Sequence, residues 1–315
     1  MNTDSNNTYA LRPDFDANAA ALKQRRNAAQ SPFIVAEIGR RLLDRLDLIR
    51  LQPKTIWVAS GQGASVATAL ARRYPLANIV AQTCSAAALP VLQVQTKRGV
   101  WAALRRKQAK VTWRFEQAEH SPQAGYDLIV ANLALDFCAS PEAEIALWAG
   151  QLNAGGVLLF STLGAETGLD LMAAANTAGW ANPTAAVCVD MHDLGDMLVQ
   201  ARLDTPVMDV ERFALTYSGT QAMRDDCRGL WGNLHARRLQ GLAGRARFAA
   251  LRDALSKVAP LQFQVEAAFG HAWRPTAENV AQKNAKNAAN GGGKVQTISL
   301  ESVRAAIIVP VEKSN

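Results

Sequence analysis

Apolar residues recur with two different spacings over residues 33–163. Within 33–49 they stand three or four residues apart, and charged Arg and Asp side chains lie on the opposite side. This spacing predicts a helix with one face over a core. Five shorter apolar runs, bounded by turn residues, predict buried strands. The helix stripe is Ile34, Ile38, Leu42, Leu46 and Ile49, and the runs are 56–60, 78–81, 111–115, 126–132 and 157–162.

Predicted helices and turns separate these strands. A glycine-containing turn at 61–65 leads into a helix at 66–74, and a helix at 143–152 leads into a turn at 153–156. Strands that alternate with helices favour a parallel sheet covered on both faces. We therefore expect an α/β fold with a doubly wound, mostly parallel, Rossmann-like sheet.

The pattern changes after residue 163. We expect a short helix at 193–201. Residues 206–217 predict two strands that meet at Glu211–Arg212, antiparallel at the sheet edge. Residues 220–257 are helical and basic, and 263–273 supply a last strand. The edge pair and the added helices extend the doubly wound core.

These elements divide the chain into four segments. Residues 1–52 form an N-terminal helical segment and 53–218 form the core. Residues 219–275 complete the core with basic helices and the last strand. Residues 276–315 form a flexible tail, because 277–297 are rich in Ala, Asn and Gly.

Composition excludes several classes of protein. No stretch approaches 18 uninterrupted apolar residues, and the N-terminus lacks a basic start followed by an apolar run, so we expect no membrane span and no secretory signal. We expect a soluble, cytoplasmic protein. Its four Cys and four His residues are dispersed without metal-ligand spacing, so we expect no metal.

The net charge of +7 concentrates in two stretches. Residues 97–110 carry six basic side chains and no acid, and 224–257 carry eight basic groups against three acids. Such patches attract polyanions, although each alone is equally well explained as a solvated face. Trp101 and Trp113 beside the first stretch raise the alternative of an RNA-binding module with stacking aromatics. No RNA-binding motif accompanies them, so nucleic acid is the weaker alternative.

Several segments carry a resemblance to a known family. They are ANLALDFC (131–138), LLFSTLGAET (158–167), residues 189–217, GLAGRARFAAL (241–251) and FGHAW (269–273). With the glycine turn after the first strand, they resemble class I S-adenosylmethionine-dependent methyltransferases. The likeness is greater to the malonyl-acyl-carrier-protein O-methyltransferases of biotin synthesis, and it covers about residues 25–275.

The resemblance implies a cofactor site for S-adenosylmethionine, but its acids are replaced. The acid at the end of the first strand corresponds to Ala59, and the third glycine of the turn corresponds to Ser65. The ribose-binding acid falls on Thr83 and the acid near adenine on Gln117. The implied cofactor-binding residues are Gly61, Gly63, Ser65, Thr83, Gln117 and Asn132.

Other positions leave alternatives open. The family's Tyr-Asp pair, which closes over the site, corresponds to Ala28 and Ala29. Asn132, at the carboxyl end of a strand, either lines the pocket or caps the following loop. His192 either acts as an acid/base or lies in a helix start capped by Asp190. No catalytic residue is assigned.

The resemblance also implies an acidic acyl carrier protein as partner for the basic helical segment. The docking residues it suggests are Arg237, Arg238, Arg245 and Arg247. For function, we favour a methyltransferase-like protein in which methyl transfer is impaired or absent, a pseudoenzyme. The main alternative is an active O-methyltransferase on a carrier-bound carboxylate, with neutral residues rebuilding the cofactor site.

Overall fold

The computed structural model describes residues 11–281, apart from 13, 30, 62, 98, 100–106, 116–124, 180–188, 231–233, 238–243 and 258–260. The chain divides into two units, Met1–Pro275 and Thr276–Asn315. In the second unit, the predicted linker begins with helical residues 277–281. The remainder of the predicted tail lies outside the described residues.

The first unit is built on a seven-stranded sheet of order β3-β2-β1-β4-β5-β7-β6. Strands β1 to β5 pair in parallel, and β7 runs antiparallel to both β5 and β6. This arrangement confirms the predicted α/β fold with an antiparallel edge. The strands are β1 Thr55–Gly61, β2 Asn78–Thr83, β3 Val111–Phe115, β4 Tyr126–Asn132, β5 Leu152–Leu163, β6 Asp204–Thr216 and β7 Gln262–Trp273.

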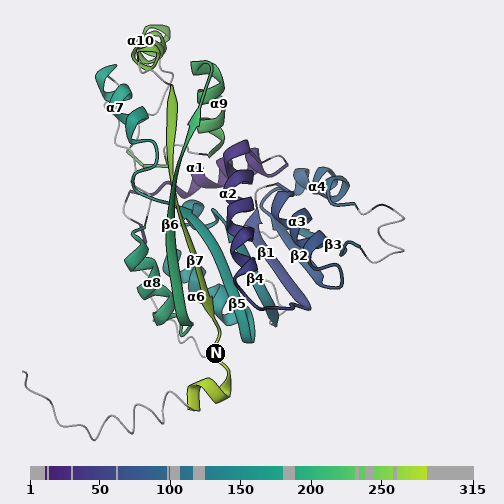
Figure 1. Cartoon of the computed structure of the whole chain (residues 1–315). Helices are drawn as coiled ribbons and strands as arrows, with labels where there is room; N and C mark the ends of the chain where they lie inside the picture. The colour runs from purple at the N-terminus through teal and green to yellow at the C-terminus, as the bar shows by residue number, and fades with distance from the viewer. Residues whose placement is uncertain are drawn as a thin grey trace, which may run out of the picture. The chain divides into compact units, whose positions relative to one another are not determined.

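Helices cover both faces of the sheet (Figure 1). The α-helices are α1 Ala17–Asn27, α2 Phe33–Asp44, α3 Ser65–Arg73, α4 Leu89–Gln95, α6 Pro141–Gln151, α7 Leu169–Thr177, α8 Met191–Gln200, α9 Thr220–Leu230 and α10 Arg245–Ser256. Three single 3₁₀ turns are η1 Arg45–Asp47, η2 Ala86–Ala88 and η3 Leu135–Phe137.

Alternation along the central strands separates two apolar cores. In β1, Ile56 and Val58 pack with α2 and α3, whereas Trp57 packs with α6 and α8 on the other face. Successive side chains of a strand point to opposite faces, so a strand covered on both sides must be apolar throughout. This is why the predicted strands were continuous apolar runs.

The prediction of two strands in 206–217 was wrong. β6 is one strand, and its register with β7 is continuous from Val207 to Thr216. Glu211 and Arg212 do not interrupt it because each charge finds a partner. Glu211 bonds Arg41, and Arg212 bonds Glu266 at 2.7 Å.

The turn predicted at residues 153–156 was also wrong. β5 already begins at Leu152, which pairs with Tyr126 of β4. The register then shifts, because Leu128 pairs with Val157. The extra residues form an irregularity within the strand, with Gly155 at φ 77°.

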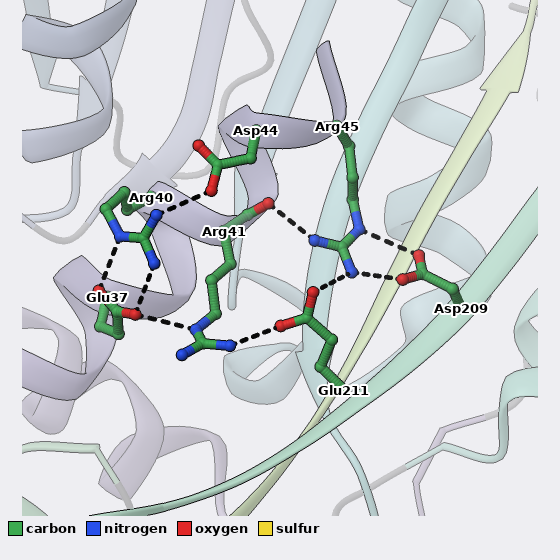
Figure 2. A network of polar contacts seen from close by, with 7 residues as sticks. All are labelled: Glu37, Arg40, Arg41, Asp44, Arg45, Asp209 and Glu211. Atoms are coloured by element: carbon green, nitrogen blue, oxygen red, sulfur yellow. Dashed lines mark hydrogen bonds and ion pairs between the residues drawn. The ribbon is translucent and has the colours of Figure 1, made fainter. Parts of the chain in front are cut away.

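A charged network joins α2 and η1 to β6 (Figure 2). Arg41 donates to Glu211 at 2.7 Å, and Arg45 donates to Glu211 at 3.0 Å and to both carboxylate oxygens of Asp209. The Arg45 guanidinium also lies 3.5 Å from the centroid of the Phe269 ring. Bidentate, partly buried arginine pairs of this kind are stronger than isolated surface pairs.

We expect Glu211→Ala to lower the free energy of unfolding by about 1–2 kcal/mol, because it leaves two arginines without their shared acceptor. Urea unfolding of the purified variant measures this. Asp44→Ala is the control, since Asp44 is 60% exposed and pairs only with Arg40 among the contacts described. Its expected effect is below about 0.5 kcal/mol. Equal losses in the two variants would contradict the role assigned to the network.

No helix within the described part of the chain is long and apolar enough to cross a membrane.

Candidate functional site

The glycine turn after β1 lies against the chain's own N-terminal segment. The Gly63 amide donates to the carbonyl of Ala28 at 3.1 Å. Gly63 has a φ of +66°, and a Cβ placed on it would meet the Ser31 hydroxyl and come within 2.8 Å of the Ser31 amide. Ala28 is fully buried. Ala28 and Ser31 therefore lie directly against Gly63 of the turn.

Gly61, Ser65 and Thr83 lie at the same edge of the sheet. Gly61 pairs with Thr83 at the carboxyl ends of β1 and β2. Thr83 is fully buried, and its hydroxyl accepts from the Ser85 amide at 3.3 Å. Ser65 is exposed and begins α3. The structure thus places three predicted cofactor residues together, at the edge where open α/β sheets bind ligands.

Of two other positions predicted at the cofactor site, Ala59 is described by the structure and Gln117 is not. Ala59 packs against the apolar core between the sheet and helices α6 and α8. At the position where the resemblance predicts an acid, the chain therefore presents a neutral methyl group. Gln117 lies outside the described residues.

Asn132 has a structural role in the described contacts. Its side-chain amide donates to the carbonyl of Val35 in α2 at 2.9 Å, and its oxygen accepts from the Ser161 hydroxyl at 2.9 Å. The side chain is 1% exposed. Asn132 therefore joins α2 to the ends of β4 and β5.

At the start of α8, Asp190 caps the helix, as one of the two alternatives for this segment predicted. The Asp190 side chain accepts from the His192 amide at 2.8 Å and caps the helix. His192 is exposed. Asp190 thereby satisfies one of the free amides at the helix start.

Sequence reasoning missed a buried carboxylate, Asp136, that lies beyond the carboxyl ends of β4 and β5. Asp136 in η3 is 7% exposed, and its Oδ1 accepts from the Thr162 hydroxyl and the Leu163 amide, each at 3.1 Å. Burial raises the pKa of Asp136 to about 6, and the positive charge of Arg12 opposes this rise. The signal in the sequence was one acid inside the apolar run 131–138.

The arginines proposed for carrier docking are only partly placed. Arg237 is exposed and pairs with Asp14 at 2.8 Å, and Arg245 begins α10 on the surface. Arg247 donates to the carbonyl of Gly179 at 3.2 Å. Arg238 lies outside the described residues. Helices α7, α9 and α10 gather beyond one end of β6 and β7, as Figure 1 shows.

One of the two tryptophans considered for RNA binding, Trp113, is buried. Trp113 is 8% exposed, and its indole nitrogen donates to Thr96 at 2.9 Å. A buried ring offers no face for a base to stack on. Trp101 lies outside the described residues.

A surface hollow of about 610 Å³ opens near Leu203 and Arg274, at the edge of the sheet opposite the glycine turn. These residues adjoin the start of β6 and the end of β7, whereas Gly63 follows the end of β1. Among the described residues, no group of three or more His, Cys, Asp or Glu side chains could hold a metal ion.

No family model matches the chain. The YcgJ protein from Bacillus subtilis superposes with a TM-score of 0.51 at 11% identity, over 76% of this chain and 99% of that one. A putative methyltransferase from Bacillus halodurans gives a TM-score of 0.50 at 16% identity, over 75% and 100%. The sheet order and these superpositions define the fold of a class I S-adenosylmethionine-dependent methyltransferase.

Sequence relatives narrow the class. The malonyl-[acyl-carrier protein] O-methyltransferase of Laribacter hongkongensis is 34% identical over 275 residues, which is 85% of this chain and 89% of the relative. The enzyme of the same name from Gallionella capsiferriformans is 32% identical over 251 residues, 78% and 85% of the two chains. The chain belongs to the malonyl-[acyl-carrier protein] O-methyltransferase family.

Membership of this family implies S-adenosylmethionine as the cofactor, but the residues at the glycine turn do not fit it. The amide of Gly63 is bonded to the Ala28 carbonyl, and Ser31 lies against the turn. Ala59 offers no acceptor, and the Thr83 hydroxyl is buried against Ser85. Cofactor hydroxyls and amines would therefore lack the charged acceptors that pair with them best.

Proposed function

We propose that this protein is a member of the malonyl-[acyl-carrier protein] O-methyltransferase family in which methyl transfer from S-adenosylmethionine is impaired or absent. The observation that carries the proposal is the contact of Ala28 and Ser31 with Gly63, whose amide is bonded to the Ala28 carbonyl. A cofactor would have to displace these residues before it could reach the backbone of the turn. Even then, the neutral side chains of Ala59 and Thr83 would offer the cofactor no charged hydrogen-bond acceptor.

The proposal keeps the other half of the family's function, which is recognition of an acid carried by an acyl carrier protein. Support comes from the basic surface of α10, where Arg245 is exposed beside the half-buried Arg247. Complementary charge speeds the encounter with an acidic carrier and orients it. The protein is then a binding or regulatory partner in biotin synthesis.

The second candidate is an active O-methyltransferase with a rebuilt cofactor site. It is favoured by the extent of the likeness to enzymes of that name, which spans 89% of the Laribacter hongkongensis relative. In this case Ala28 and Ser31 would move off the turn. The neutral groups Ser65, Thr83 and Gln117 would then supply hydrogen bonds. A second copy of the enzyme with intact acids in the same genome would favour the first candidate instead.

Calorimetric titration with S-adenosylmethionine and S-adenosylhomocysteine separates the two candidates. We expect no detectable heat up to millimolar cofactor, while the Laribacter hongkongensis relative, titrated in parallel, serves as the positive control. Binding at micromolar concentration, about −8 kcal/mol, would contradict the proposal. Complementation of a biotin-requiring strain that lacks its own methyltransferase would contradict it as well.

A further inference from the structure

The guanidinium of Arg12 is buried without a hydrogen-bond partner in the described part of the chain. This holds for Nε, Nη1 and Nη2 alike. A guanidinium carries five N–H donors and stays charged at every accessible pH. Burying such a group unpaired is unfavourable, so its position calls for an acceptor that the protein itself does not supply.

The segment that carries Arg12 is held in place by other groups. The Arg12 amide donates to the carbonyl of Ala139 at 2.8 Å, and the Asp16 amide donates to that of Leu234 at 2.8 Å. Phe15 forms an isolated antiparallel bridge with His235. These backbone contacts fix the segment, so the Arg12 side chain is not needed to anchor it.

Asp136 lies close enough to Arg12 for the positive charge of Arg12 to act on its carboxylate. Its Oδ1 is satisfied by Thr162 and Leu163, whereas its Oδ2 is buried and has no partner in the described residues. The charge of Arg12 acts on both Asp136 and Cys138. Two opposite charges thus face one region without a direct hydrogen bond between them, beyond the carboxyl ends of β4 and β5.

We propose that Arg12 binds the carboxylate of an acidic acyl ligand in this buried site, with Asp136 beside it. A planar guanidinium matches a carboxylate in a two-point contact. A carboxylate is favoured over a phosphate because a phosphate would bring a second negative charge of its own close to Asp136. In its protonated form, Asp136 Oδ2 would donate a hydrogen bond to the same ligand.

The site lies at the same sheet edge as the glycine turn, where ligands of such folds bind. The inference rests on the proposed function in one respect, that the protein keeps recognition of a carrier-bound acid. It does not depend on whether S-adenosylmethionine binds. Arg12 is a specificity-determining residue in this account, and no group is transferred.

Calorimetry with malonyl-coenzyme A and acetyl-coenzyme A tests the site, because the two probes share every phosphate and differ in the terminal carboxylate. We expect the full-length protein to bind malonyl-coenzyme A at least tenfold more tightly. Arg12→Gln should abolish this difference, and Arg12→Lys should reduce it, since Lys keeps the charge but loses the two-point contact. Arg50→Gln is the matched control, because Arg50 is exposed.

Thermal unfolding of each variant accompanies the titrations. Arg12→Gln should unfold at or above the temperature of the parent protein, because it removes an unpaired buried charge. Equal binding of the two probes by the parent protein would overturn the inference, and so would an unchanged preference in Arg12→Gln. Equal weakening of both probes by Arg12→Gln would assign Arg12 to a phosphate and overturn it too. These titrations contain no S-adenosylmethionine. A negative result in them would therefore leave the proposal on methyl transfer unaffected.

Discussion

Replacement of Gly63 by alanine will destabilise the protein by about 3 kcal/mol. Gly63 has a φ of +66°, where a Cβ costs about 1–2 kcal/mol. The new methyl group would also collide with Ser31, including its backbone amide at 2.8 Å, and overpacking of this kind costs about 1–3 kcal/mol. Ser31 and the bonded Ala28 would have to move away from Gly63. Urea unfolding and protection of the Gly63 amide against hydrogen exchange measure the two effects.

Gly150→Ala is the matched control for this substitution. Gly150 lies near the end of α6, and a Cβ there would meet no atom within 4 Å. We expect it to be neutral or to stabilise by about 0.5–1 kcal/mol, because alanine has the higher helix propensity. A Gly63→Ala protein as stable as the parent would show that Ala28 and Ser31 do not contact Gly63 in solution, and it would remove the main support for impaired methyl transfer.

The stability of the protein relative to Asp136→Asn will fall by about 3 kcal/mol between pH 4 and pH 7. The folded pKa of Asp136 is about 6, above its ordinary value of 3.8, and burial is the main cause. A raised carboxyl pKa means that the folded state favours the protonated form. The stabilisation is complete below pH 4 and is lost as the pH rises through 6. About two pKa units correspond to about 3 kcal/mol.

Urea unfolding of both proteins across this range gives the difference directly. Contributions from other carboxylates cancel. One of them is Glu37, whose hydrogen bond with Arg40 is the main cause of a pKa lowered to about 2. A difference that does not change with pH would show that Asp136 is solvated and not buried as described.

Much of the fold could be predicted because buried strands need apolar residues on both faces. The run 126–132 and the strand 263–273 were placed nearly to the residue. The errors came where local signals were overruled by pairing. Glu211 and Arg212 suggested a break, but partners on α2 and β7 let the strand continue. Asn153 and the glycines after it suggested a turn, yet the strand already begins at Leu152.

The candidate site was predicted less completely. Gly61, Gly63 and Thr83 could be located from the turn pattern, because residues that follow adjacent parallel strands meet at one edge. The engagement of Asn132 with Val35 could not be foreseen, since it depends on where α2 crosses the sheet. The electrostatic influence of Arg12 on Asp136 connects residues more than 120 positions apart, and no local pattern records it.

The sequence by itself determined the succession of the five parallel strands and the neutral residues at positions 59 and 83, because spacing and residue chemistry are local properties. The tertiary structure decided what now occupies the turn and which buried charges face each other. Ala28 and Ser31 meet Gly63 in the packed chain, and the backbone of the segment that carries Arg12 is bonded to Ala139 and Leu234. Burial and unpaired donors are properties of the packed chain, since every residue of the unfolded chain is solvated.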